Sequence, residues 1–393
     1  MSATEPHPGL LLLVLTGCAF ILGTGEIMLA GLLPEIAAEV GVSLPIAGML
    51  ISMFALTVVV GGPVLALATG GLARKPLVLA LMLLFAGGNV VAALSPSFPL
   101  LVGSRVLAAL AHAALMPLFF GVAVDLVPPE RRASAVARVS LGLSLATVIG
   151  LPIGAAVGQW LGWRAVFWAL AALTLAATAL LRLLLPTGQR AVAGRLAELR
   201  VLGDRRVQVT VAMTALGAAA AFTAYTYITP MLTDVTGFGP MTVTALLLVF
   251  GIGGTAGNVL GGRLADRALM PAICGALASL AAALLLLGSV AANKPLTVAA
   301  LFAFGAAYYA VIPVVNTRLL AVASQQARTL ALTVQSSAFN LGITAGGWFG
   351  GRLIGHGFPL WMVPVAGGVL AVLALVIAVV ESAGDRRMVE VSR

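Results

Sequence analysis

The chain has 393 residues, of which 61% are hydrophobic and only 9% are charged, and its mean hydropathy is +1.11. So few charged residues cannot cover the surface of a water-soluble protein of this length, which excludes that class. The net charge of +9 would suit a nucleic-acid-binding protein, but the charges lie in short loops between long apolar stretches, which argues for a membrane protein.

Twelve apolar stretches each approach the ~20 residues that an α-helix needs to cross ~30 Å of hydrocarbon. We therefore predict an all-α integral membrane protein with twelve transmembrane helices. The stretch from Gly9 to Leu33 is too long for the apolar part of a signal peptide, so we expect it to be retained as the first span. The predicted spans are 10–32, 46–69, 77–95, 99–124, 134–159, 165–185, 208–232, 241–262, 269–291, 296–319, 329–354 and 360–381.

Basic residues gather in the loops on one side of the predicted membrane. The opposite side carries only Arg164, Lys294 and Arg352. The positive-inside rule makes the basic side cytoplasmic, with both termini on it, and no nucleic-acid partner is needed to explain the charge. The basic residues on the cytoplasmic side are Arg74, Lys75, Arg131, Arg132, Arg138, Arg182, Arg190, Arg195, Arg200, Arg205, Arg206, Arg263, Arg267, Arg318, Arg328, Arg386, Arg387 and Arg393.

The first span carries a carboxylate, Glu26, at a depth where an acid is costly and usually belongs to a proton, ion or substrate pathway. Ala19, Gly23 and Ala30 share its helical face, so another helix is expected to pack against it. We interpret Glu26 as a proton-coupling residue. The alternative is a fixed ion pair that locks two helices in register.

The fourth span places Arg105, His112 and Phe119 on one face, because they recur every seven residues. Arg105 and Glu26 both fall in the outer half of the membrane, so we expect them to meet, and their separation would favour protonation of Glu26. His112 either carries a proton or contacts substrate, or it is a neutral contact between helices. The predicted proton-coupling residues are Glu26, Arg105 and His112.

The two halves of the chain resemble each other at an offset of 192 residues. This predicts two parallel six-helix repeats, residues 1–185 and 207–393, with the substrate path between them. The basic segment 186–206 would be a cytoplasmic linker, or less plausibly a regulatory element. The offset brings Gly70, Leu72, Ala73, Gly150, Gly154 and Gly158 onto Gly262, Leu264, Ala265, Gly342, Gly346 and Gly350.

Polar and aromatic residues interrupt the aliphatic spans of the second half, as a cavity for a neutral amphipathic molecule requires. Each of them is alternatively a bridge between helices. Trp163, Trp348 and Trp361 lie near predicted helix ends and suit interfacial anchors, and Cys18 and Cys274 suit packing rather than a disulfide or a metal site. The predicted substrate-binding residues are Phe222, Tyr225, Tyr227, Asn258, Asn316, Gln335 and Asn340.

The loop from Gly262 to Arg267, with the sequence GRLADR, resembles the loop motif of the major facilitator superfamily. The first-half copy begins at Gly70 and carries Arg74 where the family has an aspartate. Asp125, at the inner end of the fourth span, is a candidate partner for Arg74 or Lys75. The resemblance implies gating roles for Gly70, Arg74, Lys75, Asp125, Gly262, Asp266 and Arg267.

Gly150, Pro152, Gly154 and Gly158, followed by Gly162-Trp163-Arg164, resemble the antiporter motif of proton-coupled drug exporters in this superfamily. The glycines make a flat face for close helix contact, and Pro152 lets the helix bend. The segment from Gly23 to Pro34 is similar to bacterial chloramphenicol exporters and to related arabinose and sugar efflux transporters. The resemblance covers the whole chain and leaves the drug and the sugar both open.

We therefore expect a proton-coupled efflux transporter for small neutral amphipathic compounds, chloramphenicol-like drugs first and arabinose-like sugars or glycosides second. A proton-independent sugar uniporter is the further alternative. The sequence has no G-x-x-x-x-G-K-S/T loop for ATP, so we expect no cofactor and a proton gradient as the power source. Scarce histidine and cysteine argue against an enzyme, and a repeat with a buried acid argues against a channel. The implied setting is a monomer in the bacterial cytoplasmic membrane.

Overall fold

The computed structural model describes residues 8–69, 71–128, 131–186, 203–322 and 328–391, without the side chains of residues 66, 67, 133, 328–333 and 384–391. Helices make up the described secondary structure, and no strand occurs within these ranges, which confirms the predicted all-α class. A helix satisfies every backbone hydrogen bond within its own segment, as a hydrocarbon environment demands.

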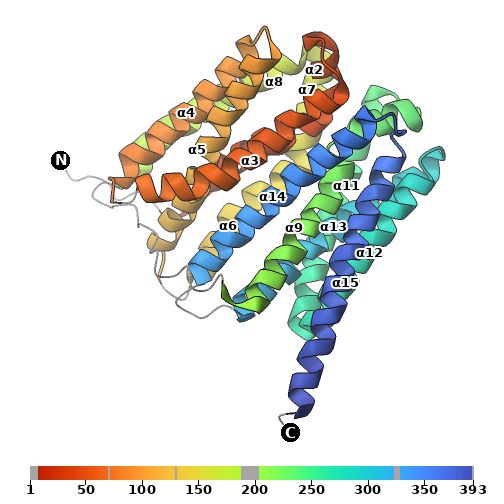
Figure 1. Cartoon of the computed structure of the whole chain (residues 1–393). Helices are drawn as coiled ribbons and strands as arrows, with labels where there is room; N and C mark the ends of the chain where they lie inside the picture. The colour runs from red at the N-terminus through yellow and green to blue at the C-terminus, as the bar shows by residue number, and fades with distance from the viewer. Residues whose placement is uncertain (1–7, 70, 129–130, 187–202, 323–327, 392–393) are drawn as a thin grey trace. The chain divides into compact units, whose positions relative to one another are not determined.

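Figure 1 shows the helices in their order along the chain. In the first half they are α1 (Pro8–Ile27), α2 (Leu29–Val40), α3 (Leu44–Ala68), α4 (Arg74–Leu94), α5 (Phe98–Asp125), α6 (Arg132–Leu145), η2 (Ala146–Gly150), α7 (Leu151–Leu161) and α8 (Trp163–Leu184). In the second half they are α9 (Arg205–Tyr225), α10 (Ile228–Pro230), η4 (Met231–Val235), α11 (Pro240–Arg267), α12 (Leu269–Ser289), α13 (Lys294–Val322), α14 (Arg328–Gly355) and α15 (Met362–Val391).

Within the described residues, 11 helices are long and apolar enough to cross a membrane. The α14 helix is the remaining long one and occupies the place of the eleventh predicted span. The count is consistent with the twelve predicted spans. The predicted continuous first span is wrong in detail, because the helix is interrupted at Met28 and resumes as α2 as far as Val40.

The seventh predicted span also differs from a continuous helix. The backbone leaves helical geometry at Tyr227, with φ −112° and ψ 20°, and then passes through α10 into the π-helical turn η4. Pro230 has no N–H, so the carbonyl of Thr226, four residues earlier, loses its helical partner. The fifth span contains a second π-helical turn, η2, directly before Gly150 and Pro152. Such turns frequently occur at functional sites.

The chain forms two compact units, Met1–Val42 with Met53–Gly194 and Ser43–Ser52 with Arg195–Arg393. In the first unit α1 packs against α6, and α4 packs against α5 and α8. In the second unit α9 packs against α14 and α15, and α11 packs against α13. Gly162, with a φ of 82°, makes the one-residue turn between α7 and α8, a conformation that glycine adopts without strain.

Candidate functional site

Glu26 lies in the last turn of α1, directly before the interruption at Met28. Two glycines just before Glu26, Gly23 and Gly25, let neighbouring helices come close. A Cβ atom at Gly25 would lie 2.9 Å from the Phe85 ring, and one at Gly23 would lie 3.0 Å from the Ala146 side chain. The local sequence therefore holds Glu26 inside the first unit, with a side-chain exposure of 22%.

His112 of α5 is the ionisable partner of Glu26. Its Nε2 atom lies 3.6 Å from Glu26 Oε2, and its side chain is 10% exposed. A carboxylate and an imidazole this close can share a proton, and a proton added to the pair changes the charge of a largely buried site. The structure thus brings together two of the three residues predicted for proton coupling.

Arg105 does not meet Glu26 as we predicted. Its Nη2 atom donates a hydrogen bond of 2.7 Å to the carbonyl oxygen of Gly25, and no ion pair between Arg105 and Glu26 occurs in the described part of the chain. The guanidinium carbon lies 4.4 Å from the centroid of the Phe54 ring, which also contacts the His112 ring edge-on at 5.5 Å. The span boundaries used to estimate depth were too imprecise to choose between Arg105 and His112.

Phe54 of α3 was not predicted for this cluster. It is 1% exposed and contacts both the guanidinium of Arg105 and the imidazole of His112. An aromatic face attracts a cation, so Arg105 makes a cation–π contact with Phe54 in place of an ion pair with Glu26. No signal in the sequence distinguishes Phe54 from the other apolar residues of the second span.

The predicted loop contacts occur at the helix ends of the first unit. Arg74, 7% exposed at the start of α4, forms an ion pair with Asp125 at the end of α5. Lys75 donates a hydrogen bond of 2.7 Å to the carbonyl oxygen of Leu185, just after α8. The arginine that replaces the family's aspartate thus forms the predicted pair, while Gly70 lies outside the described residues.

The corresponding loop of the second unit lies at the end of α11 and is more open. Asp266 and Arg267 are exposed, and a Cβ atom at Gly262 would meet nothing within 4 Å. The better sequence match to the loop motif is therefore the less enclosed of the two copies.

The glycines of the fifth span face the first span, as their spacing predicts. A Cβ atom at Gly150 would overlap Thr24, one at Gly154 would lie 3.4 Å from Met28, and one at Gly158 would overlap Leu32. Pro152 lies in the first turn of α7, directly after the π-helical turn. The glycine motif thus packs closely against the helix segment around Glu26.

The substrate residues predicted for the second unit fall into separate places. Phe222 and Tyr225 belong to a ring cluster with Tyr308, Phe339 and Phe250 that reaches over α9, α11, α13 and α14. The aromatic residues Phe304, Tyr308 and Tyr309, close together in the tenth predicted span, were the overlooked signal for this cluster.

Other predicted members lie apart from these rings. Tyr227 is 1% exposed, and its hydroxyl donates a hydrogen bond of 3.1 Å to the Gly347 carbonyl, which gives it a packing role between α10 and α14. Asn340 shares its helical face with Thr344, whose hydroxyl contacts Ser52. Asn258 and Asn316 are half-buried on α11 and α13.

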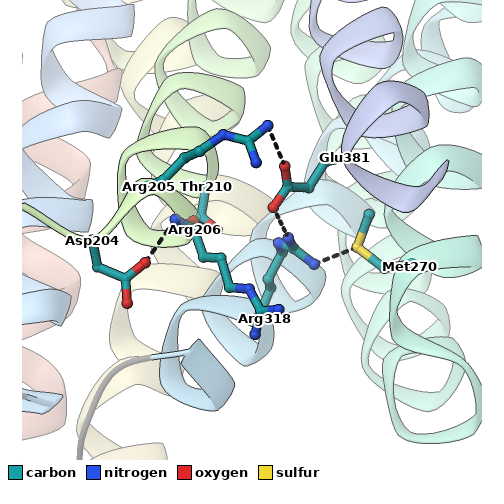
Figure 2. A network of polar contacts seen from close by, with 7 residues as sticks. All are labelled: Asp204, Arg205, Arg206, Thr210, Met270, Arg318 and Glu381. Atoms are coloured by element: carbon teal, nitrogen blue, oxygen red, sulfur yellow. Dashed lines mark hydrogen bonds and ion pairs between the residues drawn. The ribbon is translucent and has the colours of Figure 1, made fainter. Parts of the chain in front are cut away.

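An unpredicted network joins side chains of α9, α13 and α15 in the second unit (Figure 2). Glu381 of α15 is 4% exposed and lies 2.9 Å from Nη2 of Arg318, which is 3% exposed on α13. Arg205, at the start of α9, lies 3.5 Å from the other carboxylate oxygen of Glu381. The Nη1 atom of Arg318 also contacts the sulfur of Met270.

The predicted anchoring role of Trp163 is wrong. This tryptophan is 1% exposed, and its indole N–H donates a hydrogen bond of 2.7 Å to Glu39 at the end of α2. Arg164 pairs with the same carboxylate and donates to the Ser95 carbonyl at 2.9 Å. Trp348 and Trp361 are 56% and 43% exposed, as an anchor requires.

Comparison with known proteins gives a consistent result over the whole length. The model of the Major Facilitator Superfamily matches residues 15–332. The inner membrane transport protein YdhP of Escherichia coli O157:H7 is 40% identical over 367 residues, 93% of this chain and 94% of that protein. A chloramphenicol resistance protein of Streptomyces lividans is 36% identical over 383 residues, 94% and 95% of the two chains.

Solved structures show the same fold at lower identity. A bacterial homologue of the human lysosomal transporter Spinster, in an inward-facing and occupied conformation, matches with a TM-score of 0.76 and 17% identity over 97% of this chain and 98% of that one. The human organic anion transporter MFSD10 matches with a TM-score of 0.70 and 16% identity, over 95% of this chain and 100% of that one.

Proposed function

Because the chain belongs to the Major Facilitator Superfamily of membrane transporters, we propose that it exports small neutral amphipathic compounds in exchange for protons. The observation that carries this proposal is the enclosed pair of Glu26 and His112, 3.6 Å apart, in the first and fourth spans. The 36% identity to a chloramphenicol resistance protein supports chloramphenicol-like drugs as the first substrates to test.

In the proposed cycle a proton enters the Glu26–His112 pair from the outside and leaves to the cytoplasm. With the proton bound, either both groups of the pair are neutral or the two form an ion pair, and the helices that carry them pack closely. Without the added proton, Glu26 remains charged in an enclosed site, which disfavours that packing. Proton binding thereby biases the equilibrium between two conformations of the transporter.

The available energy suits this role. A proton moving inward across ~100 mV releases about 2.3 kcal/mol, and each pH unit of gradient adds about 1.4 kcal/mol. The sum sustains a substrate gradient of several hundred-fold, since about 1.4 kcal/mol corresponds to a tenfold ratio. The proposal includes a bacterial inner-membrane location, cytoplasmic termini, a monomer and no cofactor, with halves 1–185 and 207–393 moving about the linker.

Transport in proteoliposomes tests the coupling. An imposed pH gradient should drive chloramphenicol movement by the parent protein but not by Glu26→Gln, while Glu26→Gln still exchanges labelled for unlabelled drug at equal concentrations. Glu35→Gln is the matched control, because it makes the same chemical change on the following helix, α2, away from His112. It should retain gradient-driven transport.

Other outcomes lead to different conclusions. If Glu26→Gln responds to the gradient as the parent does, Glu26 is structural and the coupling proposal fails. If the parent moves arabinose but not chloramphenicol, the sugar alternative replaces the drug. Sugar transport that ignores pH in both proteins would identify a uniporter.

A further inference from the structure

Three helices of the second unit bring aromatic rings together in one place. Phe222 of α9 contacts Tyr308 of α13 and Phe339 of α14 edge-on, with centroid distances of 6.0 and 6.4 Å. Tyr308 and Phe339 lie nearly parallel, with an interplanar angle of 24° and a centroid distance of 6.3 Å. All three distances lie in the range of about 4.5–7 Å for aromatic contacts, so the three rings form one cluster.

The cluster has a closed base and a more open edge. Phe304 and Phe250 are 0% and 1% exposed and contact each other at 5.2 Å. Phe222 and Tyr308 are 7% and 6% exposed, whereas Phe339 is half-buried. A ligand that reaches these rings therefore meets Phe339 first.

A polar group lies one helical turn before Phe339 on the same face of α14. The Nε2 atom of Gln335 donates a hydrogen bond of 2.7 Å to the Thr214 hydroxyl. That hydroxyl donates its only hydrogen to the Thr210 carbonyl at 2.9 Å, so it can only accept from Gln335. The orientation of the Gln335 amide is thereby fixed, with its carbonyl oxygen turned away from Thr214.

The carbonyl oxygen of Gln335 is buried, and no donor reaches it from the described residues. A buried acceptor without a donor costs about 1–3 kcal/mol. A ligand that donates an O–H or N–H recovers this cost, and a ligand ring gains contact with the aromatic faces. The oxygen is closed off from water in this structure, so the ligand must enter in another conformation of the transport cycle.

We propose that Gln335, Phe339, Tyr308 and Phe222 form a substrate subsite for an aryl group that carries a nearby O–H or N–H donor. The subsite lies wholly in the second unit. The proposal rests on the proposed transport function and narrows its substrates to aryl compounds with donors over simple sugars. Asn340, on another face of α14, is not part of it.

Equilibrium binding to the purified protein tests the ring contact. Calorimetry should show phenyl β-D-glucoside binding on the order of tenfold more tightly than methyl β-D-glucoside, because an aromatic contact contributes about 0.5–1.5 kcal/mol beyond its burial. Phe339→Leu should remove that preference. Phe304→Leu, which deletes a ring from the closed base, should keep it.

A second ligand pair tests the hydrogen bond. Gln335→Met keeps the length of the side chain but has no carbonyl, and it should weaken chloramphenicol binding on the order of tenfold. The N-methyl di-O-methyl ether of chloramphenicol lacks both the hydroxyl and the amide N–H donors and should bind equally to parent and variant. Melting temperatures close to that of the parent would show that each variant is folded.

Equal binding of the two glucosides, or the same loss from Phe304→Leu as from Phe339→Leu, would overturn the ring subsite. Failure of the parent to bind any aryl probe would overturn it as well. An equal effect of Gln335→Met on chloramphenicol and its ether would overturn the hydrogen bond. These binding measurements use no pH gradient, so they test the subsite separately from the coupling. If the protein shows this selectivity but no proton-driven transport, only the proposed coupling is refuted. If it shows proton-driven transport of sugars alone, only the subsite is refuted.

Discussion

Two carboxylates of the consecutive helices α1 and α2, Glu26 and Glu35, lie in different surroundings. Glu26 has His112 within 3.6 Å, whereas the Oε2 atom of Glu35 is buried with no hydrogen-bond partner in the described part of the chain. Glu35 lies beyond the candidate span that ends at Ile27. Burial raises the pKa of the Glu35 carboxyl above its ordinary value, and a backbone hydrogen bond partly opposes this. The two glutamates are the same residue type, so the difference in their environments comes from the residues around them.

The raised pKa of Glu35 predicts a pH dependence of stability. A carboxyl with a raised pKa holds its proton more tightly in the folded than in the unfolded state, so this contribution to stability is lost as the pH rises from the ordinary carboxyl range through the raised pKa. Glu35→Gln should therefore melt higher than the parent at neutral pH, and the difference should vanish near pH 4, close to the ordinary carboxyl pKa of about 4.3. Asp266→Asn, at an exposed site, should show no such trend, and a parallel trend in both variants would contradict the assignment.

The sequence showed that the first span carries an acid, Glu26, but not which side chain lies beside it. A lone acid in an apolar stretch is visible in one dimension, because its cost does not depend on which helix lies beside it. The choice between Arg105 and His112 depends on depth to within about one helical turn of 5.4 Å. Span ends read from hydropathy are not that accurate: the first helix begins at Pro8 and is interrupted at Met28.

At the scale of helices, the close packing at the repeated glycines was predictable from the sequence, because small residues allow helices to approach closely. Gly154 of α7 and Gly346 of α14 are equivalent at the offset of 192 residues. A Cβ atom at Gly346 would overlap the Ala219 carbonyl and lie 2.9 Å from the Thr223 nitrogen, both backbone atoms of α9. A Cβ atom at Gly154 would make an ordinary contact of 3.4 Å with Met28. The equivalent positions 154 and 346 thus leave different amounts of space for a side chain.

This difference predicts opposite responses to the same substitution. Gly346→Ala should lower the melting temperature because α9 and α14 must separate, with a cost of about 1–3 kcal/mol for overpacking. Gly154→Ala should be neutral, or stabilising by up to about 1 kcal/mol, since alanine favours the helix. Gly275→Ala, in open space on α12, controls for helix propensity. Equal losses at Gly346 and Gly154 would show that the two interfaces are equally tight.

The interruptions of the spans escaped prediction for a physical reason. A single turn with altered hydrogen bonding at Met28 or Tyr227 leaves the mean hydropathy of its span unchanged. Pro230 gave a hint at Tyr227, but prolines also lie inside the uninterrupted helices α5 and α13. Whether a proline breaks a helix depends on what satisfies the freed carbonyl, which is a matter of packing.

At the scale of the whole molecule, the least predictable features join helices far apart in sequence. Glu381 and Arg318 are 63 residues apart, and Arg205 belongs to the end of the linker. In the sequence all three resemble ordinary charges at helix ends, and Arg318 was assigned to the solvated basic loops. The burial of Glu381 and Arg318 shows that charge near a span end does not establish contact with water. The network ties the start of α9 to α13 and α15 (Figure 2).

The network predicts a graded loss of stability. Glu381→Ala takes away the carboxylate that binds buried Arg318, so it should cost about 3–5 kcal/mol and shorten the half-life of the detergent-solubilised protein at a fixed temperature. Arg205→Ala should cost no more than about 1 kcal/mol, because the Arg205 side chain is 76% exposed. The double variant Glu381→Leu with Arg318→Met should regain most of the loss, since an apolar pair needs no charge compensation. If Glu381→Ala costs no more than Arg205→Ala, the buried pair of Glu381 and Arg318 does not stabilise the second unit.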